Sequence, residues 1–397
     1  MEWKEYNICQ LCDTISETYK GKSNSVVLIN TSDVLEGKVL NHKRVPNKGL
    51  KGQFKKTFKK NDILYSEIRP ANKRFAYINF SPNDYIASTK LMVLRSKPIV
   101  SSYFLFQILK SEIVLKNLQM LAESRSGTFP QITYSELSNV RVKVPPLPVQ
   151  DKIVGILSAL DSKIENNNKI NGNLEAQAQA LFKSWFVDFT PFKDQPFVDS
   201  ELGPIPQGWK VGKLGDYVEI KRGGSPRPIQ KFLASQGLNW LKISDATSTQ
   251  SPFIFNIKEK IIIDGLKKTV FLKAGSLVLS NSATPCIPKF LSIDSCIHDG
   301  WLYFPHSQLP ENYLYLFFKL MRNNLVSKAN GSVFLNLKTD IVKNQVFAFS
   351  GEEIYNSFDK IIAPLFKEIE NLTYETFQLS ALRDTLLPKL MSGEIKL

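Results

Sequence analysis

The sequence predicts an α+β protein with two similar globular domains, each rich in short strands with some helices, separated and joined by two long helices. The long helices are expected to pair as an antiparallel coiled coil, so that the chain carries an internal pseudo-two-fold repeat. Three observations predict this architecture: a globular composition, two heptad ladders, and a sequence repeat at a spacing of about 205 residues.

The composition is that of an ordinary folded protein. The 397 residues are 43% hydrophobic and 22% charged, and at roughly 150 residues per domain this length suggests two or three domains. No apolar run approaches the roughly 18 residues of a membrane span, and the first residues lack the apolar core of a signal peptide. Four cysteines are too few for a disulfide scaffold. We therefore expect a cytoplasmic protein with no membrane partner.

The charge is strongly basic and unevenly distributed. The chain has 51 Lys and Arg against 37 Asp and Glu, a net charge of +14, which favours a polyanion partner, nucleic acid before an anionic membrane. From Lys38 to Arg74 only two acids, Asp62 and Glu67, stand among the basic residues. Interleaved aromatic residues indicate a folded basic surface rather than a disordered tail. Phosphate contact is favoured for this segment, with a solvated charged face as the alternative.

The first long helix is predicted from Pro148 to Phe186. Apolar residues recur there in alternating steps of four and three, which is the spacing of a coiled-coil seam. The ladder runs through Ile153, Leu157, Leu160, Ile164, Asn167, Asn171, Leu174, Ala178, Leu181 and Trp185. Pro148 suits the first turn of a helix. The Asn-rich stretch 165–173, which also contains Gly172, predicts a weak point in the helix.

The second long helix repeats the first in the same register. Its ladder is Phe358, Ile362, Leu365, Ile369, Leu372, Thr376, Leu379, Arg383, Leu386 and Leu390, each 205 positions after its counterpart. Ser350 with Glu353 forms a capping-box pattern at its start, and Gly393 follows its last apolar turn. Pro364 is expected either to kink this helix or to mark its true start.

The segments before each helix also resemble one another. The paired segments are Trp3-Lys4 with Trp209-Lys210, 29–33 with 241–245, 62–66 with 276–280, and 104–110 with 313–319. Several matches in one order indicate a duplicated unit. The predicted organisation is domain one at 1–147, helix one at 148–190, a linker at 191–208, domain two at 209–349 and helix two at 350–397.

Four groups of residues resemble one protein family, and the resemblance covers nearly the whole chain. These groups are 145–150 with 153–157, 181–189 with 200–209, 223–226 with 240–245, and 386–395. They are similar to the helix boundaries, loop-and-strand start and C-terminal ending of specificity subunits of type I restriction-modification systems. Together the groups are specific, whereas each alone is a weak signal.

The resemblance implies a non-catalytic DNA-specificity subunit. Each globular domain would read one half of a bipartite, asymmetric DNA target. The coiled coil would set the spacing and dock two methylation subunits, and motor-nuclease subunits would join the full complex. The chain itself would bind no cofactor or metal, because S-adenosylmethionine is expected on the methylation subunits. Lys20–Asn24 departs from Arg222–Pro226 at the corresponding place, so the two domains are expected to read different half-sites.

Candidate DNA contacts come from the basic segments. Because basic residues mostly hold phosphates, the candidates are Lys43, Arg44, Lys48, Lys51, Lys55, Lys56, Arg69, Lys73 and Arg74 in domain one, and Lys221, Arg222, Arg227, Lys267 and Lys268 in domain two. Phe182, Trp185 and Phe186 are read either as a docking surface for a methylation subunit or as a hinge core. The base-reading residues are not identified by the sequence.

Motifs of enzymes and metal sites are incomplete. Ser16 to Ser23 differs from a phosphate-binding loop at its first glycine. Cys9 and Cys12 have the spacing of half a zinc site, without a matching second half. Asp62 to Arg69 is a weak match to a metal-dependent nuclease, and no Asn-Pro-Pro or Asp-Pro-Pro precedes an aromatic residue. Two alternatives stay open beside the specificity subunit: a protein-binding helical scaffold, and a self-contained DNA nuclease or methyltransferase.

Overall fold

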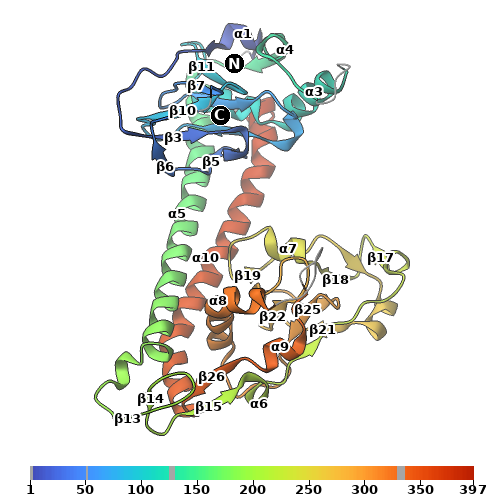
Figure 1. The fold of residues 1–397 in the computed structure, drawn as a ribbon. Coiled ribbons are helices and arrows are strands. Elements are labelled where there is room, and N and C mark those ends of the chain that lie inside the picture. The colour runs from blue at the N-terminus through green and yellow to red at the C-terminus, as the bar shows by residue number, and fades with distance from the viewer. Residues whose placement is uncertain (1–2, 51, 125–129, 329–335) are drawn as a thin grey trace. The chain divides into compact units, whose positions relative to one another are not determined.

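The computed structural model describes residues 3–50, 52–124, 130–328 and 336–397. The chain divides into two compact units: unit 1 comprises Met1–Asp161 with Ala381–Leu397, and unit 2 comprises Ser162–Ser380. Each unit is β-rich and contains part of both long helices, α5 (Leu147–Phe186) and α10 (Glu352–Ser392) (Figure 1). The α+β fold with two long helices packed together is the predicted one.

Unit 1 contains two four-stranded sheets, ordered β6-β3-β10-β7 and β2-β11-β8-β9, and two small ladders, β1-β12 and β4-β5. Apolar, partly β-branched runs such as Ser25–Ile29 suit the buried strands of these sheets. The strands are β1 (Lys4–Asn7), β2 (Cys12–Ile15), β3 (Ser25–Ile29), β4 (Val34–Leu35), β5 (Lys38–Val39), β6 (Arg44–Pro46), β7 (Phe54–Lys56), β8 (Ile63–Ser66), β9 (Phe75–Tyr77), β10 (Tyr85–Ser88), β11 (Leu91–Ser96) and β12 (Arg141–Val144).

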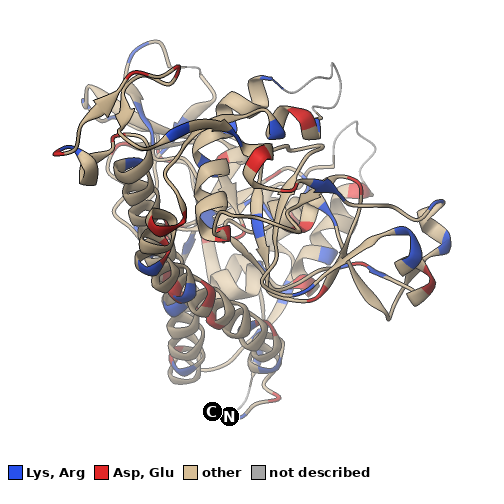
Figure 2. Cartoon of the chain, turned by 90° about the horizontal axis from the view of Figure 1, so that it is seen from below, with Lys and Arg blue, Asp and Glu red and all other residues tan. Residues whose placement is uncertain are grey.

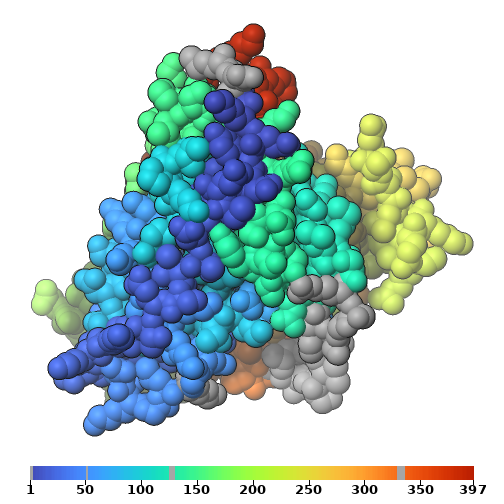
Figure 3. Space-filling model, turned by 90° about the horizontal axis from the view of Figure 1, so that it is seen from above, coloured from blue at the N-terminus to red at the C-terminus, as the bar shows by residue number. Residues whose placement is uncertain are grey.

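Short helices cover these sheets and begin at capping residues. The hydroxyl of Ser101 accepts from the Phe104 amide at the start of α2, and Ser111 does the same for Val114 at the start of α3. The helices are α1 (Ile8–Leu11), η1 (Thr31–Asp33), η2 (Pro70–Asn72), α2 (Ser102–Leu109), α3 (Glu112–Glu123) and α4 (Tyr134–Ser138). The main core of unit 1 joins them to the start of α5 and to Leu390 near the end of α10. Figure 3 shows the C-terminal end of the chain in red beside green residues of the same unit.

Unit 2 contains two five-stranded sheets, ordered β16-β25-β22-β23-β19 and β17-β20-β18-β24-β21, with the ladders β13-β14 and β15-β26. The strands are β13 (Phe197–Val198), β14 (Ile205–Pro206), β15 (Lys210–Lys213), β16 (Lys221–Arg222), β17 (Leu233–Ala234), β18 (Leu238–Leu241), β19 (Phe253–Ile254), β20 (Lys260–Ile261), β21 (Val270–Leu272), β22 (Leu277–Ser280), β23 (Pro288–Leu291), β24 (Ser295–Ile297), β25 (Trp301–Tyr303) and β26 (Val346–Phe349). Its helices are η3 (Thr190–Phe192), α6 (Leu214–Tyr217), η4 (Ile229–Lys231), α7 (Ile243–Thr247), η5 (Ile263–Lys268), α8 (Glu311–Ser327) and α9 (Thr339–Lys343).

The two units repeat one strand topology. In unit 1 the parallel pair β3/β10 is flanked by antiparallel β6 and β7, and in unit 2 the parallel pair β18/β24 is flanked by antiparallel β20 and β21. The antiparallel order β2-β11-β8-β9 likewise corresponds to β16-β25-β22-β23. The duplication seen in the sequence is therefore a duplication of fold.

Helix α5 is continuous through the stretch 165–173, a point that the sequence left open. Two of its asparagines bond to α10: Asn167 Nδ2 donates to Glu375 at 2.8 Å and Asn171 Nδ2 to Thr373 Oγ1 at 3.1 Å. Later residues of α5 thus meet earlier residues of α10, and the helices run antiparallel within unit 2. These contacts outweigh the low helix propensity of asparagine.

The helix ends differ slightly from the predicted ones. Helix α5 begins at Leu147, which puts Pro148 in its first turn. Helix α10 begins at Glu352, one residue after Gly351, and passes through Pro364, so Pro364 does not mark the start of the helix. Gly393 directly follows the helix with a φ of 76°, a conformation that favours glycine.

The predicted seam is buried most completely near the two globular cores. Ile153, Leu157, Ile362 and Ile369 are at most 1% exposed. Ala178, Phe358 and Leu390 of the same ladders are also buried. Eight further leucine and isoleucine positions are half-buried: Leu160, Ile164, Leu174, Leu181, Leu365, Leu372, Leu379 and Leu386. No helix in the described ranges is long and apolar enough to span a membrane.

Candidate nucleic-acid interface

Three lysines of unit 1 carry unpaired charge within or next to β6 and β7, the two edge strands of one sheet. Lys43, Lys48 and Lys55 are exposed, and their ammonium groups bond to no other residue of the described chain. Such flexible, unneutralised charges can follow a phosphate backbone without strict geometry. Lys51, predicted with them, lies outside the described residues.

Other predicted contacts of unit 1 already interact within the protein. Arg44 Nη1 donates to the Ser25 carbonyl at 3.0 Å and lies 3.7 Å from an Asp84 carboxylate oxygen. Lys73 pairs with Glu36 at 3.5 Å. Arg69 is exposed and precedes η2 with a φ of 44°.

Lys56 and Arg74 donate hydrogen bonds to backbone carbonyls within unit 1. Lys56 Nζ donates to the carbonyls of Thr89 and Leu91 at 3.0 and 2.9 Å, and burial lowers its pKa. Arg74 Nη1 donates to the Ser32 carbonyl at 3.0 Å. Both side chains are half-buried, so they hold unit 1 together and present less charge to a ligand than their neighbours.

The two acids of the basic segment, Asp62 and Glu67, interact with basic residues outside the segment. Asp62 is 1% exposed and accepts two hydrogen bonds of 2.8 Å from Arg95. These bonds raise the pKa of Arg95. Glu67 lies 3.7 Å from Lys90, outside the segment. The acids are neutralised by basic residues outside the segment, and Lys43, Lys48 and Lys55 keep their excess charge.

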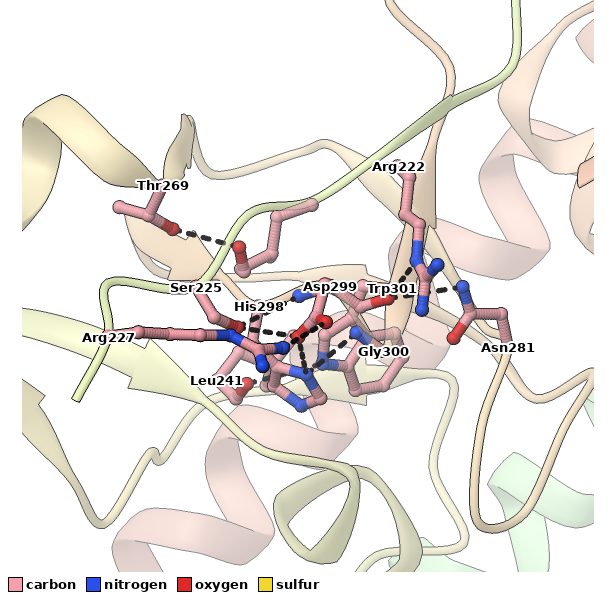
Figure 4. A network of polar contacts seen from close by, with 11 residues as sticks. Arg222, Ser225, Arg227, Leu241, Thr269, Asn281, His298, Asp299, Gly300 and Trp301 are labelled. Atoms are coloured by element: carbon pink, nitrogen blue, oxygen red, sulfur yellow. Dashed lines mark hydrogen bonds and ion pairs between the residues drawn. The ribbon is translucent and has the colours of Figure 1, made fainter. Parts of the chain in front are cut away.

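In unit 2 a loop and a turn form a compact polar network (Figure 4). The loop follows β16, and the turn joins β24 to β25. Asp299 lies at the centre: its carboxylate accepts from Ser225 Oγ at 2.6 Å and from Arg227 Nη2 at 3.2 Å. The Ser225 bond is the main reason why the pKa of Asp299 lies below its usual value. The backbone carbonyl of Asp299 accepts from Arg222 Nε and, at 3.3 Å, from Asn281 Nδ2.

Glycines allow the loop and turn to approach so closely. A Cβ added to Gly223 would lie 2.3 Å from the His298 carbonyl oxygen, and one added to Gly300 would lie 2.2 Å from His298 Cε1. His298 Nδ1 accepts from the Gly300 amide at 2.8 Å, so its imidazole is neutral with the proton on Nε2, and burial lowers its pKa. The network is therefore held by packing as well as by charge.

The other predicted contacts of unit 2 are exposed. Lys221 pairs with Glu219 at 2.7 Å, and this hydrogen bond raises the pKa of Lys221. Lys267 and Lys268 end η5, and Lys268 Nζ lies 5.5 Å from the ring centroid of Phe232. Figure 2 shows basic and acidic residues together on the lobe at the right of the view, which belongs to unit 2.

The three aromatic residues considered for partner docking lie in the core of unit 2. Phe182 is 2% exposed, and its ring centroid lies 5.0 Å from that of Tyr313. Trp185 and Phe186 are half-buried against the same core and against Phe358. The contacts fit the hinge-core interpretation, and docking at these residues stays a prediction.

The sequence did not identify Asp299, Ser225 or Asn281 as parts of a site. The available signal was the pair Gly223-Gly224 together with Gly300, because adjacent glycines often mark a close approach of backbone. Cys12 is buried, and burial raises the pKa of its thiol to about 12. In the described ranges no three His, Cys, Asp or Glu residues are grouped to hold a metal ion.

Comparison with known proteins shows that most of the chain matches one family. The model of the type I restriction modification DNA specificity domain matches residues 1–176 and 206–377. The specificity subunit of the type I restriction enzyme HindI from Haemophilus influenzae is 32% identical, over 99% of this chain and 100% of that protein. The MjaIX specificity subunit from Methanocaldococcus jannaschii is 27% identical over 89% of this chain and 82% of its own length.

A solved structure has a similar fold. The S subunit of a type I restriction-modification system from M. genitalium matches with a TM-score of 0.58 and 16% identity, covering 98% of this chain and 96% of that one. The two β-rich units and the paired long helices thus recur in a protein with little sequence identity to this chain.

Proposed function

Because this chain belongs to the type I restriction-modification specificity family and is the DNA specificity subunit of such a system, we propose that each of its two units reads one half of a bipartite, asymmetric DNA target. The observation that carries the proposal is the duplicated fold, in which both units have basic residues on outer strands and loops. The two basic surfaces differ in residues and partners, which supports two different half-sites. The helix pair α5 and α10 would set the unread gap between them.

The specificity subunit is part of a type I restriction enzyme complex. We infer that two methylation subunits bind this chain and carry S-adenosylmethionine, and that motor-nuclease subunits join them for restriction. The duplicated fold supports two methylation subunits, because each repeat presents an equivalent surface to its own copy. This chain would bind double-stranded DNA and supply no cofactor.

A methylation map tests the proposal. Genomic DNA would be compared between cells that express the chain with its neighbouring methylation subunit and cells that lack the chain. A new two-part adenine motif with a fixed gap, dependent on this chain, is the expected result. A soluble complex without a new motif would remove sequence specification and favour the protein-binding scaffold.

The phosphate contacts are tested by the salt dependence of binding. Changing Lys43, Lys48 and Lys55 together to Gln should make the slope of log K against log salt shallower by about 3, since each lost phosphate contact costs about one unit. Lys56→Gln is the matched control, because that side chain is bonded to the Thr89 and Leu91 carbonyls. An unchanged slope in the triple variant would show that Lys43, Lys48 and Lys55 do not contact DNA.

A further inference from the structure

The basic residues of unit 2 differ in what holds their charged groups. Lys221 pairs with a carboxylate of Glu219 at 2.7 Å, and Arg227 with the carboxylate of Asp299 at 3.2 Å. Arg222 instead donates through Nε to a backbone carbonyl, that of Asp299. The charge of Arg222 also acts on the nearby Asp299 carboxylate, but no hydrogen bond or ion pair within the described residues joins that carboxylate to Arg222, and the carbonyl bond orients the guanidinium in a fixed direction.

The rest of the Arg222 guanidinium is available to a ligand. The side chain is exposed, and its Nη1 and Nη2 groups bond to no residue of the described ranges. The Asp299 carbonyl also accepts from Asn281 Nδ2 at 3.3 Å, and a carbonyl oxygen has two lone pairs. Both lone pairs are therefore in use, and Figure 4 shows the side chains of Arg222 and Asn281 converging on this carbonyl.

The turn beneath Arg222 is rigid. Its backbone lies against Gly223 and around Gly300, where no Cβ fits. Ser225 Oγ donates to the Asp299 carboxylate at 2.6 Å and fixes the turn from the other side. A phosphate contact tolerates a mobile side chain, whereas discrimination between bases depends on donors fixed in position. A guanidinium held in a fixed position therefore suits contacts to base edges better than contacts to phosphates.

The surroundings of the guanidinium are mixed in charge. Arg222 and Asn281 line a pocket of about 360 Å³ together with Lys338, Thr339 and Asp340. An amide, a hydroxyl and a carboxylate beside two basic groups match the donors and acceptors of base edges. A site for a phosphate would be expected to present basic groups without a carboxylate among them.

We propose that Arg222 reads a guanine in the half-site of unit 2, with its Nη1 and Nη2 groups donating to guanine O6 and N7 in the major groove. Arginine makes this two-pronged contact more often than any other specific base contact. Asn281 and the turn at Asp299 act as positioning residues for Arg222. The inference rests on the proposed function, since it requires that unit 2 read DNA.

The test uses the complex of this chain with its methylation subunits and a duplex that carries the mapped motif. Each guanine of the motif is replaced in turn by 7-deazaguanine, which lacks the N7 acceptor. Binding is measured for the wild type, Arg222→Gln and Lys267→Gln. Lys267 is the matched control, because it is an exposed basic residue of the same unit with no described partner.

For the wild type and for Lys267→Gln, 7-deazaguanine at one position should weaken binding clearly. For Arg222→Gln the same replacement should not weaken binding any further, because the contact to N7 is already lost. That variant should also lose about 5- to 150-fold of its preference for guanine at this position alone. Lys267→Gln should weaken all sequences equally.

Two results would overturn the inference. One is an Arg222→Gln complex that loses affinity equally for every sequence while the motif stays intact. The other is a 7-deazaguanine effect that persists undiminished in Arg222→Gln at all positions. Failure of the proposed function would look different, since the wild-type complex itself would then show no motif. The melting temperature of each variant distinguishes a local loss from unfolding.

Discussion

At the scale of the residue, Lys289 shows how a basic side chain is accommodated in the protein interior. Lys289 in β23 is 4% exposed, and its Nζ donates to the carbonyls of Thr249, at 2.9 Å, and Ser251. Burial, with the nearby charge of Lys319, lowers its pKa to about 8, although Glu175 acts in the opposite direction. A neutral amine still has two N–H donors, so both carbonyl bonds survive loss of the proton.

Unit 2 should become more stable as the pH rises from 8 towards 10.5. The folded-state pKa of Lys289 lies below its ordinary value of 10.5, so the unfolded chain binds more protons in this range. We expect a gain of about 2–3 kcal/mol between pH 7 and 10. Urea unfolding of the wild type and Lys289→Met at several pH values measures it, with the exposed Lys360→Met as control. Parallel pH curves for wild type and Lys289→Met would contradict the expectation.

The candidate site shows which roles of single residues can be predicted from the sequence and which cannot. Lys55 and Lys56 are adjacent and equally basic, yet Lys55 is exposed and Lys56 donates to two carbonyls. Composition locates such a surface, but the alternation of a strand decides which side chain faces solvent. The role of Asp299 could not be predicted even with Gly300 beside it, because its partners Ser225 and Asn281 lie 74 and 18 residues away.

At the scale of the element, the pairing of α5 and α10 includes polar side chains that are only partly satisfied. The Oδ1 atoms of Asn167 and Asn171 are buried without a hydrogen-bond partner, as is Oγ1 of Thr376. Each buried polar group without a partner lowers the free energy of unfolding by about 1–3 kcal/mol. Buried asparagines in a coiled coil can fix the register of the helices at a cost in stability, and this role fits their bonds to Glu375 and Thr373.

Replacing both asparagines by leucine should raise the melting temperature of the protein and weaken the register of the helix pair. The stability gain is expected at about 1–3 kcal/mol, from removal of the unpaired acceptors. Asn173→Leu, on the exposed side of the same helix, is the control. Cysteine pairs placed across α5 and α10 would report the register. A double variant that melts at a lower temperature would show that the asparagines stabilise the pair.

The heptad ladder predicted both long helices, since period and register follow from local spacing. It left open whether α5 continues through 165–173 and whether Pro364 lies within α10 or marks its start; both helices continue. Those outcomes depend on contacts between residues about 200 positions apart, which propensity scales do not include. The strand order inside each unit was also beyond the sequence, because many short strands allow many pairings.

At the scale of the whole molecule, the last residues of the chain belong to the same unit as the first. Leu390 is 1% exposed within the core of unit 1, where it is grouped with residues of the N-terminal segment such as Ile8. Trp3 Nε1 lies so close to Gly393 that an added Cβ would be 2.6 Å from it. The stability of unit 1 therefore depends on residues from both ends of the sequence.

Leu390→Ala should destabilise unit 1 by about 2–5 kcal/mol through the cavity it leaves, and unit 2 much less. Hydrogen exchange measures both at once: amides of α2 in unit 1 should exchange faster, while those of α8 in unit 2 keep their protection. Leu382→Ala, 47% exposed on the same part of α10, is the matched control. Faster exchange in α8 but not in α2 would refute the dependence of unit 1 on Leu390.

This shared core bears on how the protein is made. Unit 2 is one continuous stretch of chain, whereas unit 1 lacks residues 381–397 until the whole of unit 2 has been synthesised. About 220 residues separate its two parts, so a ribosome adding roughly 5–20 residues per second leaves the first part waiting for about 10–45 s. The domain that is translated first is therefore the one completed last, and during that interval its exposed apolar face is a substrate for chaperones.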